Sequence, residues 1–251
     1  YPRLQPLLPV RTELSRVLVF FGGVDLDNYA AVALEAFSHP RLGHLAVDVV
    51  LGAGAPHYAD LQVRVQQRPH TSLHMGLPSL AGLMARADLV VLCLHDQAVV
   101  ESVAIIDDMA RASGQAGPKI IDASTAHRTA PGWVYGFPEL SIGQAARVAQ
   151  ARRVSNPGCY PTGAIALIRP LVDAGLLPPD AALSLPAVTG YSGGGRSMIE
   201  AYEKGEAPPF ELYGLGLKHK HLPEIMQYTG LTRRPVFIPS VGNFRQGMLV
   251  Q

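Results

Sequence analysis

The sequence predicts an α/β fold in which a doubly wound parallel sheet is followed by a second domain of α+β character. Two observations lead to this prediction. Short continuous runs of β-branched residues and leucine alternate with segments whose apolar residues recur at helical spacing, the pattern of a parallel sheet covered on both faces. After about Asn156 this alternation ends, and segments interrupted by glycine and proline follow.

The first part of the chain repeats a strand, a turn and a helix. The expected strands are residues 17–21, 47–51, 89–94 and 119–122. The expected helices are residues 29–37, 80–85 and 97–109. Such a domain is typical of nucleotide binding, with ligands beyond the carboxyl ends of the strands.

The second part opens with a Pro-Gly-Cys-Tyr-Pro turn before a helix expected at residues 162–174. Strands broken by a Gly-Gly-Gly run at 193–195 and by a Pro-Pro pair at 208–209 follow. We therefore place a domain boundary between residues 1–155 and 156–251.

Composition excludes several classes of protein. The chain has 251 residues, 48% hydrophobic and 16% charged, with a net charge of +1, which excludes disordered and collagen-like chains. The near-zero charge argues against nucleic acid and favours a small-molecule substrate. The sequence contains neither an apolar run of about 18 residues nor a signal pattern. We therefore expect no membrane span and a location in the cytoplasm. The missing initial Met suggests a fragment.

Cys159 follows the turn and precedes the helical run GAIALIRPLV. A thiol at a helix N-terminus meets the positive end of the dipole and free N–H groups, both of which favour the thiolate. The alternative is a buried cysteine that acts as a small hydrophobe. Cys93 lies in the apolar run LVVLCL and is expected in the core. The cysteines lack the spacing of a zinc site, and no metal is expected.

A thiolate nucleophile needs an acid or base, and Lys-His-Lys-His at 218–221 supplies His219 and His221. The alternative is a solvated basic loop. The run TGYSGGGR at 189–196 offers glycines for close backbone approach and Arg196 for an anion, or else forms a flexible turn. DASTAHR at 122–128 follows a strand end, where ligands dock, or else caps a helix.

From about residue 86 to residue 251 these motifs resemble the short form of the N-acetyl-gamma-glutamyl-phosphate reductases, NADPH-dependent enzymes of arginine biosynthesis. The resemblance rests on IIDASTAHR, SNPGCYPTGAIALI, AVTGYSGGGR and GLKHKHLPEI, in that order. It implies that Cys159 attacks the acyl phosphate and that hydride from NADPH reduces the resulting thioester to an aldehyde. The family's H-x-H-x-P-E-I motif makes His221 the favoured acid/base, with His219 as the alternative.

Further contacts are expected around this nucleophile. Substrate contacts are expected from Asn156 and Gly158 at the oxyanion, and from Arg128, Ser192, Gly193 and Arg196 at the phosphate or carboxylate. Cofactor contacts, to NADP, are expected from Gly22, Gly23, Asp96 and Ser124. The resemblance also implies a homo-oligomer built through the second domain.

Two departures qualify the resemblance. The first strand is followed by FGGVDLDN, with Gly22 and Gly23 in place of a three-glycine loop. Residues 11–90 resemble instead the UDP-sugar hydrolases of pseudaminic acid biosynthesis, with a glycosyltransferase-like nucleotide domain, so that 1–90 and 91–155 would have different ancestry. The chain also stops in the strand-like run GMLVQ, which suggests C-terminal truncation.

The expected function is therefore reduction of N-acetyl-gamma-glutamyl phosphate, impaired by an incomplete cofactor site. The alternatives are a UDP-sugar-binding or hydrolysing protein and a non-catalytic remnant.

Overall fold

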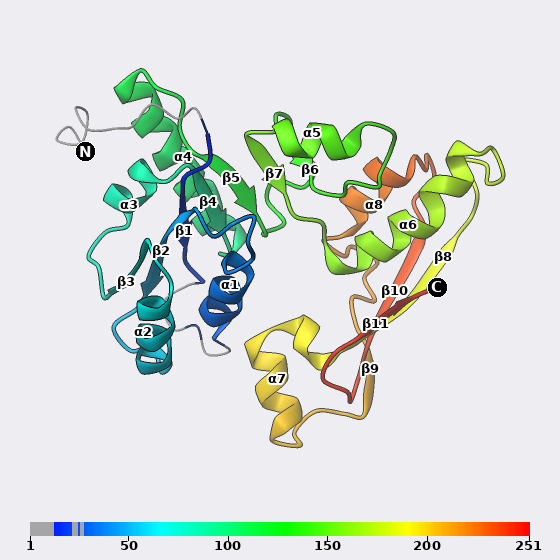
Figure 1. The fold of residues 1–251 in the computed structure, drawn as a ribbon. Coiled ribbons are helices and arrows are strands. Elements are labelled where there is room, and N and C mark those ends of the chain that lie inside the picture. The colour runs from blue at the N-terminus through cyan, green and yellow to red at the C-terminus, as the bar shows by residue number, and fades with distance from the viewer. Residues whose placement is uncertain (1–12, 22–24, 26–27) are drawn as a thin grey trace. The chain divides into compact units, whose positions relative to one another are not determined.

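The computed structural model describes residues 13–21, 25 and 28–251 (Figure 1). Gly22 and Gly23, expected at the cofactor, lie outside the described residues. The chain divides into two compact units. Unit 1 comprises Tyr1–Gly136 and Arg147–Asn156, and unit 2 comprises Phe137–Ala146 and Pro157–Gln251.

Unit 1 contains a parallel sheet of seven strands in the order β3-β2-β1-β4-β5-β7-β6. Its strands are β1 (Arg16–Val19), β2 (Ala46–Leu51), β3 (Thr71–Met75), β4 (Leu89–Leu92), β5 (Lys119–Asp122), β6 (Val134–Tyr135) and β7 (Arg153–Ser155). The strand order reverses direction between β1 and β4, which is the topological switch point of a doubly wound sheet. The predicted fold class is confirmed.

Helices cover both faces of this sheet. They are α1 (Tyr29–Phe37), α2 (Tyr58–Gln67), α3 (Ala81–Arg86) and α4 (Asp96–Ser113), and α5 (Gln144–Gln150) follows further along the chain. Alternate residues of β1 enter different cores: Val17 and Val19 pack with α1 and α2, whereas Leu18 packs with α3 and α4. This alternation explains why the strand is apolar throughout.

The structure corrects two details of the predicted elements. Cys93 lies just beyond the end of β4 and is partly exposed, so it is not a core residue of that strand. The segments α2 and β3 were not predicted at all. Among the residues of α2, Leu61 is the buried one, and β3 is an edge strand without a buried residue, so neither carries the apolar pattern of the other elements.

Unit 2 is built on a mixed sheet in the order β11-β8-β10-β9. Its elements are α6 (Cys159–Asp173), β8 (Ser184–Gly190), the 3-10 turn η2 (Tyr191–Gly194), α7 (Arg196–Glu203), β9 (Phe210–Leu212), α8 (Leu222–Thr229), β10 (Val236–Gly242) and β11 (Met248–Val250). Strands β8 and β10 are parallel, and β9 and β11 pair antiparallel to them. The α+β prediction is confirmed.

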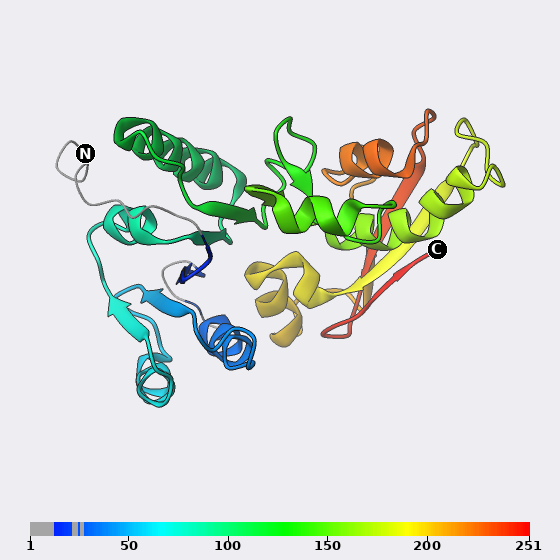
Figure 2. The same ribbon diagram turned by 45° about the horizontal axis from the view of Figure 1, so that its top comes forward.

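Helices α6 and α8 pack on one face of this sheet. Figure 2 shows α6 running across β8 and β10. The shared core includes Tyr160 and Ile168 of α6, Ile225 of α8, Leu185 of β8 and Phe237 of β10. Because this core anchors α6 and α8 together, it fixes the residues at their N-terminal ends, where the candidate site lies.

Within the described ranges, no helix combines the length and the apolar character needed to cross a bilayer.

Candidate active site

The thiol of Cys159 lies on the first residue of α6, which begins three residues before the predicted start. Gly158 is the N-cap, with extended backbone, and its carbonyl oxygen accepts hydrogen bonds from the amide and hydroxyl of Thr162 at 3.0 and 2.8 Å. Pro161 fits in the first turn because amides there have no helical acceptor. Cys159 is exposed, so the structure does not support its interpretation as a buried hydrophobe.

An aromatic cluster surrounds Tyr160, the residue after Cys159. The ring of Tyr160 is 2% exposed and makes edge contacts with Phe237, His221 and His219, at centroid distances of 5.2, 5.9 and 6.2 Å. Since Tyr160 follows Cys159 in the chain, both candidate histidines are held next to the nucleophile's own turn of helix.

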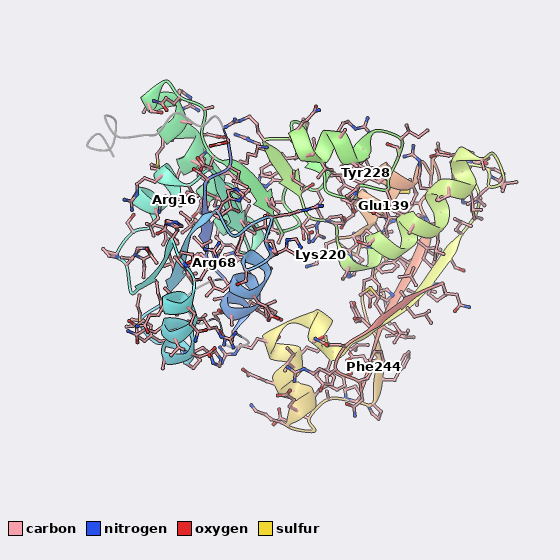
Figure 3. All side chains as sticks on the ribbon, viewed as in Figure 1. Arg16, Arg68, Glu139, Lys220, Tyr228 and Phe244 are labelled. Atoms are coloured by element: carbon pink, nitrogen blue, oxygen red, sulfur yellow. The ribbon has the colours of Figure 1, made fainter. Side chains whose placement is uncertain are left out.

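The two histidines differ in their surroundings. The backbone amide of His221 donates to Nδ1 of His219 at 3.2 Å, which places the proton of a neutral His219 ring on Nε2. Burial, and then the charge of Lys220, lowers the pKa of His219. His221 is 5% exposed and is the N-cap of α8, whereas His219 is partly exposed and Lys220, labelled in Figure 3, is exposed.

A chain of hydroxyl groups runs from this cluster into the sheet. The hydroxyl of Tyr213 donates to that of Tyr160 at 3.1 Å, which donates to the carbonyl oxygen of Ser240 at 3.0 Å. Burial raises the pKa of Tyr213, the hydrogen bond to Tyr160 lowers it, and the charge of an ionised Cys159 raises it. Sequence reasoning missed Tyr213, which carries no motif signal of its own.

A buried carboxylate also reaches the cysteine turn. Glu224 of α8 is 1% exposed, and its Oε2 accepts a hydrogen bond from the amide of Gly158 at 3.0 Å. Sequence reasoning missed this residue too, although it belongs to the HLPEI segment beside the histidines. The available signal was the glutamate three residues after a candidate catalytic histidine.

Unit 1 holds four of the predicted site residues near the end of β5, namely Asp96, Ser124, Arg128 and Asn156. Asp122 is fully buried, and its carboxylate accepts from the amide and hydroxyl of Ser124 at 2.7 and 2.9 Å and pairs with Nδ1 of His127 at 2.7 Å. The His127 ring stacks on Trp133 at 4.1 Å. Asp96 caps the same loop, since its Oδ1 accepts from the Thr125 amide at 2.9 Å.

Arg128 and Asn156 also meet in unit 1. The guanidinium of Arg128 is buried, with Nε donating to the carbonyl oxygen of Asn156 at 3.0 Å and Nη2 to that of Ala123 at 3.3 Å. The Asn156 amide in turn donates to the backbone of Asp122 at 2.7 Å. These contacts favour a structural role for Arg128, and its predicted role as an anion ligand remains a prediction.

The glycine-rich turn has a packing explanation in this structure. A Cβ on Gly193 would lie 2.7 Å from Oγ1 of Thr189, so the chain passes too closely there for a side chain. The amide of Ser192 donates to the backbone of Arg245. Arg196 begins α7, is exposed and pairs with Glu200 at 2.6 Å. The three substrate residues predicted in this turn, Ser192, Gly193 and Arg196, therefore belong to the same unit as Cys159.

The N-terminus of α1 is where a cofactor pyrophosphate would be expected to bind. In doubly wound folds the pyrophosphate contacts the amides that begin the first helix. Here the carboxylate of Asp25 accepts hydrogen bonds from the amides of Tyr29 and Ala30, both at 2.9 Å. An anion already occupies these donors, so the described residues of α1 do not fit a dinucleotide bound in this way.

Comparison with known proteins gives a family match for part of the chain and a similar fold. Residues 159–251 match the family model of the semialdehyde dehydrogenase dimerisation domain. The fold is similar to aspartate semialdehyde dehydrogenase II from Vibrio cholerae, with a TM-score of 0.60, 11% identity, and coverage of 94% of this chain and 72% of that chain. Aspartate semialdehyde dehydrogenase from Francisella tularensis has a TM-score of 0.58 and 12% identity, with coverage of 94% of this chain and 74% of that chain. At these identities the likeness concerns the fold.

Three curated N-acetyl-gamma-glutamyl-phosphate reductases are similar to this chain. The protein from Burkholderia lata is 54% identical over 65% of this chain and 51% of its own length. Reductase 2 of Pseudomonas putida is 56% identical over 64% of this chain and 50% of its own length. The Burkholderia cenocepacia protein is 47% identical over 76% of this chain and 63% of its own length. The chain is thus similar to these reductases at 47–56% identity and spans 50–63% of their length.

Proposed function

We propose that this chain carries the acyl-phosphate chemistry of N-acetyl-gamma-glutamyl-phosphate reductase, an activity of arginine biosynthesis in the cytoplasm. The observation that carries the proposal is the exposed Cys159 thiol at the start of α6, next to two histidines. The sulfur attacks the acyl carbon of N-acetyl-gamma-glutamyl phosphate, a C–S bond forms, and the C–O bond to phosphate breaks with its electron pair leaving on phosphate.

The surrounding groups supply what this step needs. The first-turn amides of α6 lack helical acceptors and can donate to a developing oxyanion. His219, whose neutral ring carries its proton on Nε2 because Nδ1 accepts from the His221 amide, donates a hydrogen bond from Nε2–H to the oxyanion or the leaving phosphate and keeps the proton. This arrangement favours His219 over His221, the reverse of the preference drawn from sequence.

The relatives are named reductases, so a reduction would follow the acylation. We propose NADP as the hydride donor, by resemblance. Because Asp25 occupies the amides at α1, we expect this chain to perform the acylation and to be impaired in the reduction.

The test is to mix the protein with N-acetyl-gamma-glutamyl phosphate and measure released phosphate together with the mass of the Cys159 peptide. We expect about one phosphate per chain in a burst and an N-acetylglutamyl adduct on Cys159. Cys93→Ser should behave like the wild type, whereas Cys159→Ser should release none. Equal bursts from both variants would remove Cys159 from the mechanism.

We also propose a homo-oligomer formed through unit 2, supported by the match to a dimerisation domain. The sheet face opposite α6 and α8 exposes Leu212, Val236 and Leu249 at 47, 45 and 58%, and register places Leu249 beside Val188 on this face. Replacing Leu249 by Glu should give monomers in sedimentation velocity. The matched Leu215→Glu, at an exposed loop residue, should leave the oligomer intact.

A further inference from the structure

Glu224 is a buried carboxylate whose hydrogen bond leaves its own helix. It occupies the third position of α8, after Leu222 and Pro223, and it is 1% exposed. A buried carboxylate is unfavourable unless it accepts hydrogen bonds. Its Oε2 accepts from the amide of Gly158, 66 residues away in sequence, at 3.0 Å.

The geometry corresponds to a capping box divided between two helices. In a capping box, a glutamate at the third helical position accepts the backbone amide of the N-cap residue of its own helix. Glu224 has that position in α8, where His221 is the N-cap, but it accepts the amide of Gly158, the N-cap of α6. The N-terminal dipole of α8 favours the negative charge that the contact uses.

The contact with Glu224 means that both backbone polar groups of Gly158, the residue before Cys159, are hydrogen-bonded. The carbonyl oxygen of Gly158 is held by Thr162, through its amide and its hydroxyl. The amide of Gly158 is held by Glu224. Both ends of the Gly158 residue are therefore bonded, one by its own helix and one by the helix that follows the histidines.

We infer that Glu224 is a positioning residue for Cys159, which fixes the first turn of α6 by capping Gly158 from a neighbouring helix. The inference rests on the proposed function in that it takes Cys159 as the nucleophile. Without the carboxylate the Gly158 amide is buried with its acceptor lost, the first turn frays, and the sulfur loses the helix N-terminal field that favours its thiolate.

The effect of the hydrogen bond can be separated from the effect of the charge. Glu224→Gln and Glu224→Ala both remove the charge, but the glutamine side chain keeps an oxygen that accepts the Gly158 amide. Thr229→Val is the matched control, because it removes a buried hydrogen bond to the Ile225 carbonyl in the same helix and leaves the Gly158 contact in place.

Two measurements on the intact chain are needed. The first is residue-resolved hydrogen exchange of the Gly158 amide. The second is the rate at which iodoacetamide alkylates Cys159, read by peptide mass spectrometry, with Cys93 as the internal reference. Neither uses the reductase substrate, so a failure of the proposed function and a failure of this inference give different results.

We expect the Gly158 amide of Glu224→Ala to exchange at least tenfold faster than that of Glu224→Gln, and Cys159 of Glu224→Ala to alkylate at least threefold more slowly. Thr229→Val should match the wild type in both rates, and Cys93 should be unchanged throughout. Equal alkylation of Cys159 in the two Glu224 variants, with faster exchange in one, would reduce Glu224 to a purely structural residue. Equal exchange in both would overturn the inference altogether.

Discussion

Replacing Asp25 by Gly tests why the first helix does not fit a dinucleotide. Asp25 has a φ of 44°, in the left-handed region that glycine adopts without strain, so the backbone can keep its path. The change removes the acceptor of the Tyr29 and Ala30 amides. Loss of such a cap costs about 0.5–2 kcal/mol, which lowers the melting temperature by about 2–4 °C per kcal/mol for a chain of this size.

The same change frees two amides and removes a negative charge where a pyrophosphate would bind. A charge at a helix N-terminus contributes about 0.3–1 kcal/mol, and up to about 2 kcal/mol when partly buried. Since about 1.4 kcal/mol corresponds to a factor of ten, NADPH affinity should rise by up to about tenfold in Asp25→Gly. The assay is titration of NADPH by isothermal calorimetry.

Glu35→Gln is the matched control, because it removes the same charge from an exposed position of the same helix. It should leave both NADPH affinity and melting temperature near the wild-type values. If the wild type binds NADPH as tightly as Asp25→Gly, the carboxylate does not exclude the cofactor and our reasoning about α1 is wrong.

Three further predictions concern unit 2 and the thiols. Phe237→Ala should lower the free energy of unfolding by about 3–5 kcal/mol, because Phe237 is 2% exposed, while Phe210→Ala at a 56% exposed ring should change it little; urea titration measures both. Burial and Lys220 lower the pKa of His219, so the unfolded chain takes up the proton at a higher pH than the folded chain. Stability should therefore fall as pH drops below about 6.5, and His219→Asn should weaken that dependence. Burial and Asp122 raise the pKa of Cys93, so iodoacetamide at pH 7 should modify the exposed Cys159 first, and the reverse order would contradict the assignment.

Local pattern alone determined much of this fold. The continuous apolar runs predicted β1, β2, β4 and β5. In β1 and β2 the reason is that side chains are buried on both faces of the sheet, so apolar residues are not confined to alternate positions. Helix α1 was predicted with its observed bounds. The glycine and prolines around Cys159 indicated a thiol at the start of a helix, which depends on neighbouring residues only.

Tertiary structure decided what depends on distant residues. The carboxylate of Glu224 and the amide of Gly158 are 66 positions apart, and the hydroxyls of Tyr213 and Tyr160 are 53 apart. No periodicity records such pairs, because they arise where α6, α8 and the sheet of unit 2 pack together. The occupation of the α1 amides by Asp25 likewise depended on the conformation of one turn. Neighbouring residues thus determined the elements that the sequence predicted and the place of Cys159 at a helix start, and packing determined which groups surround that residue.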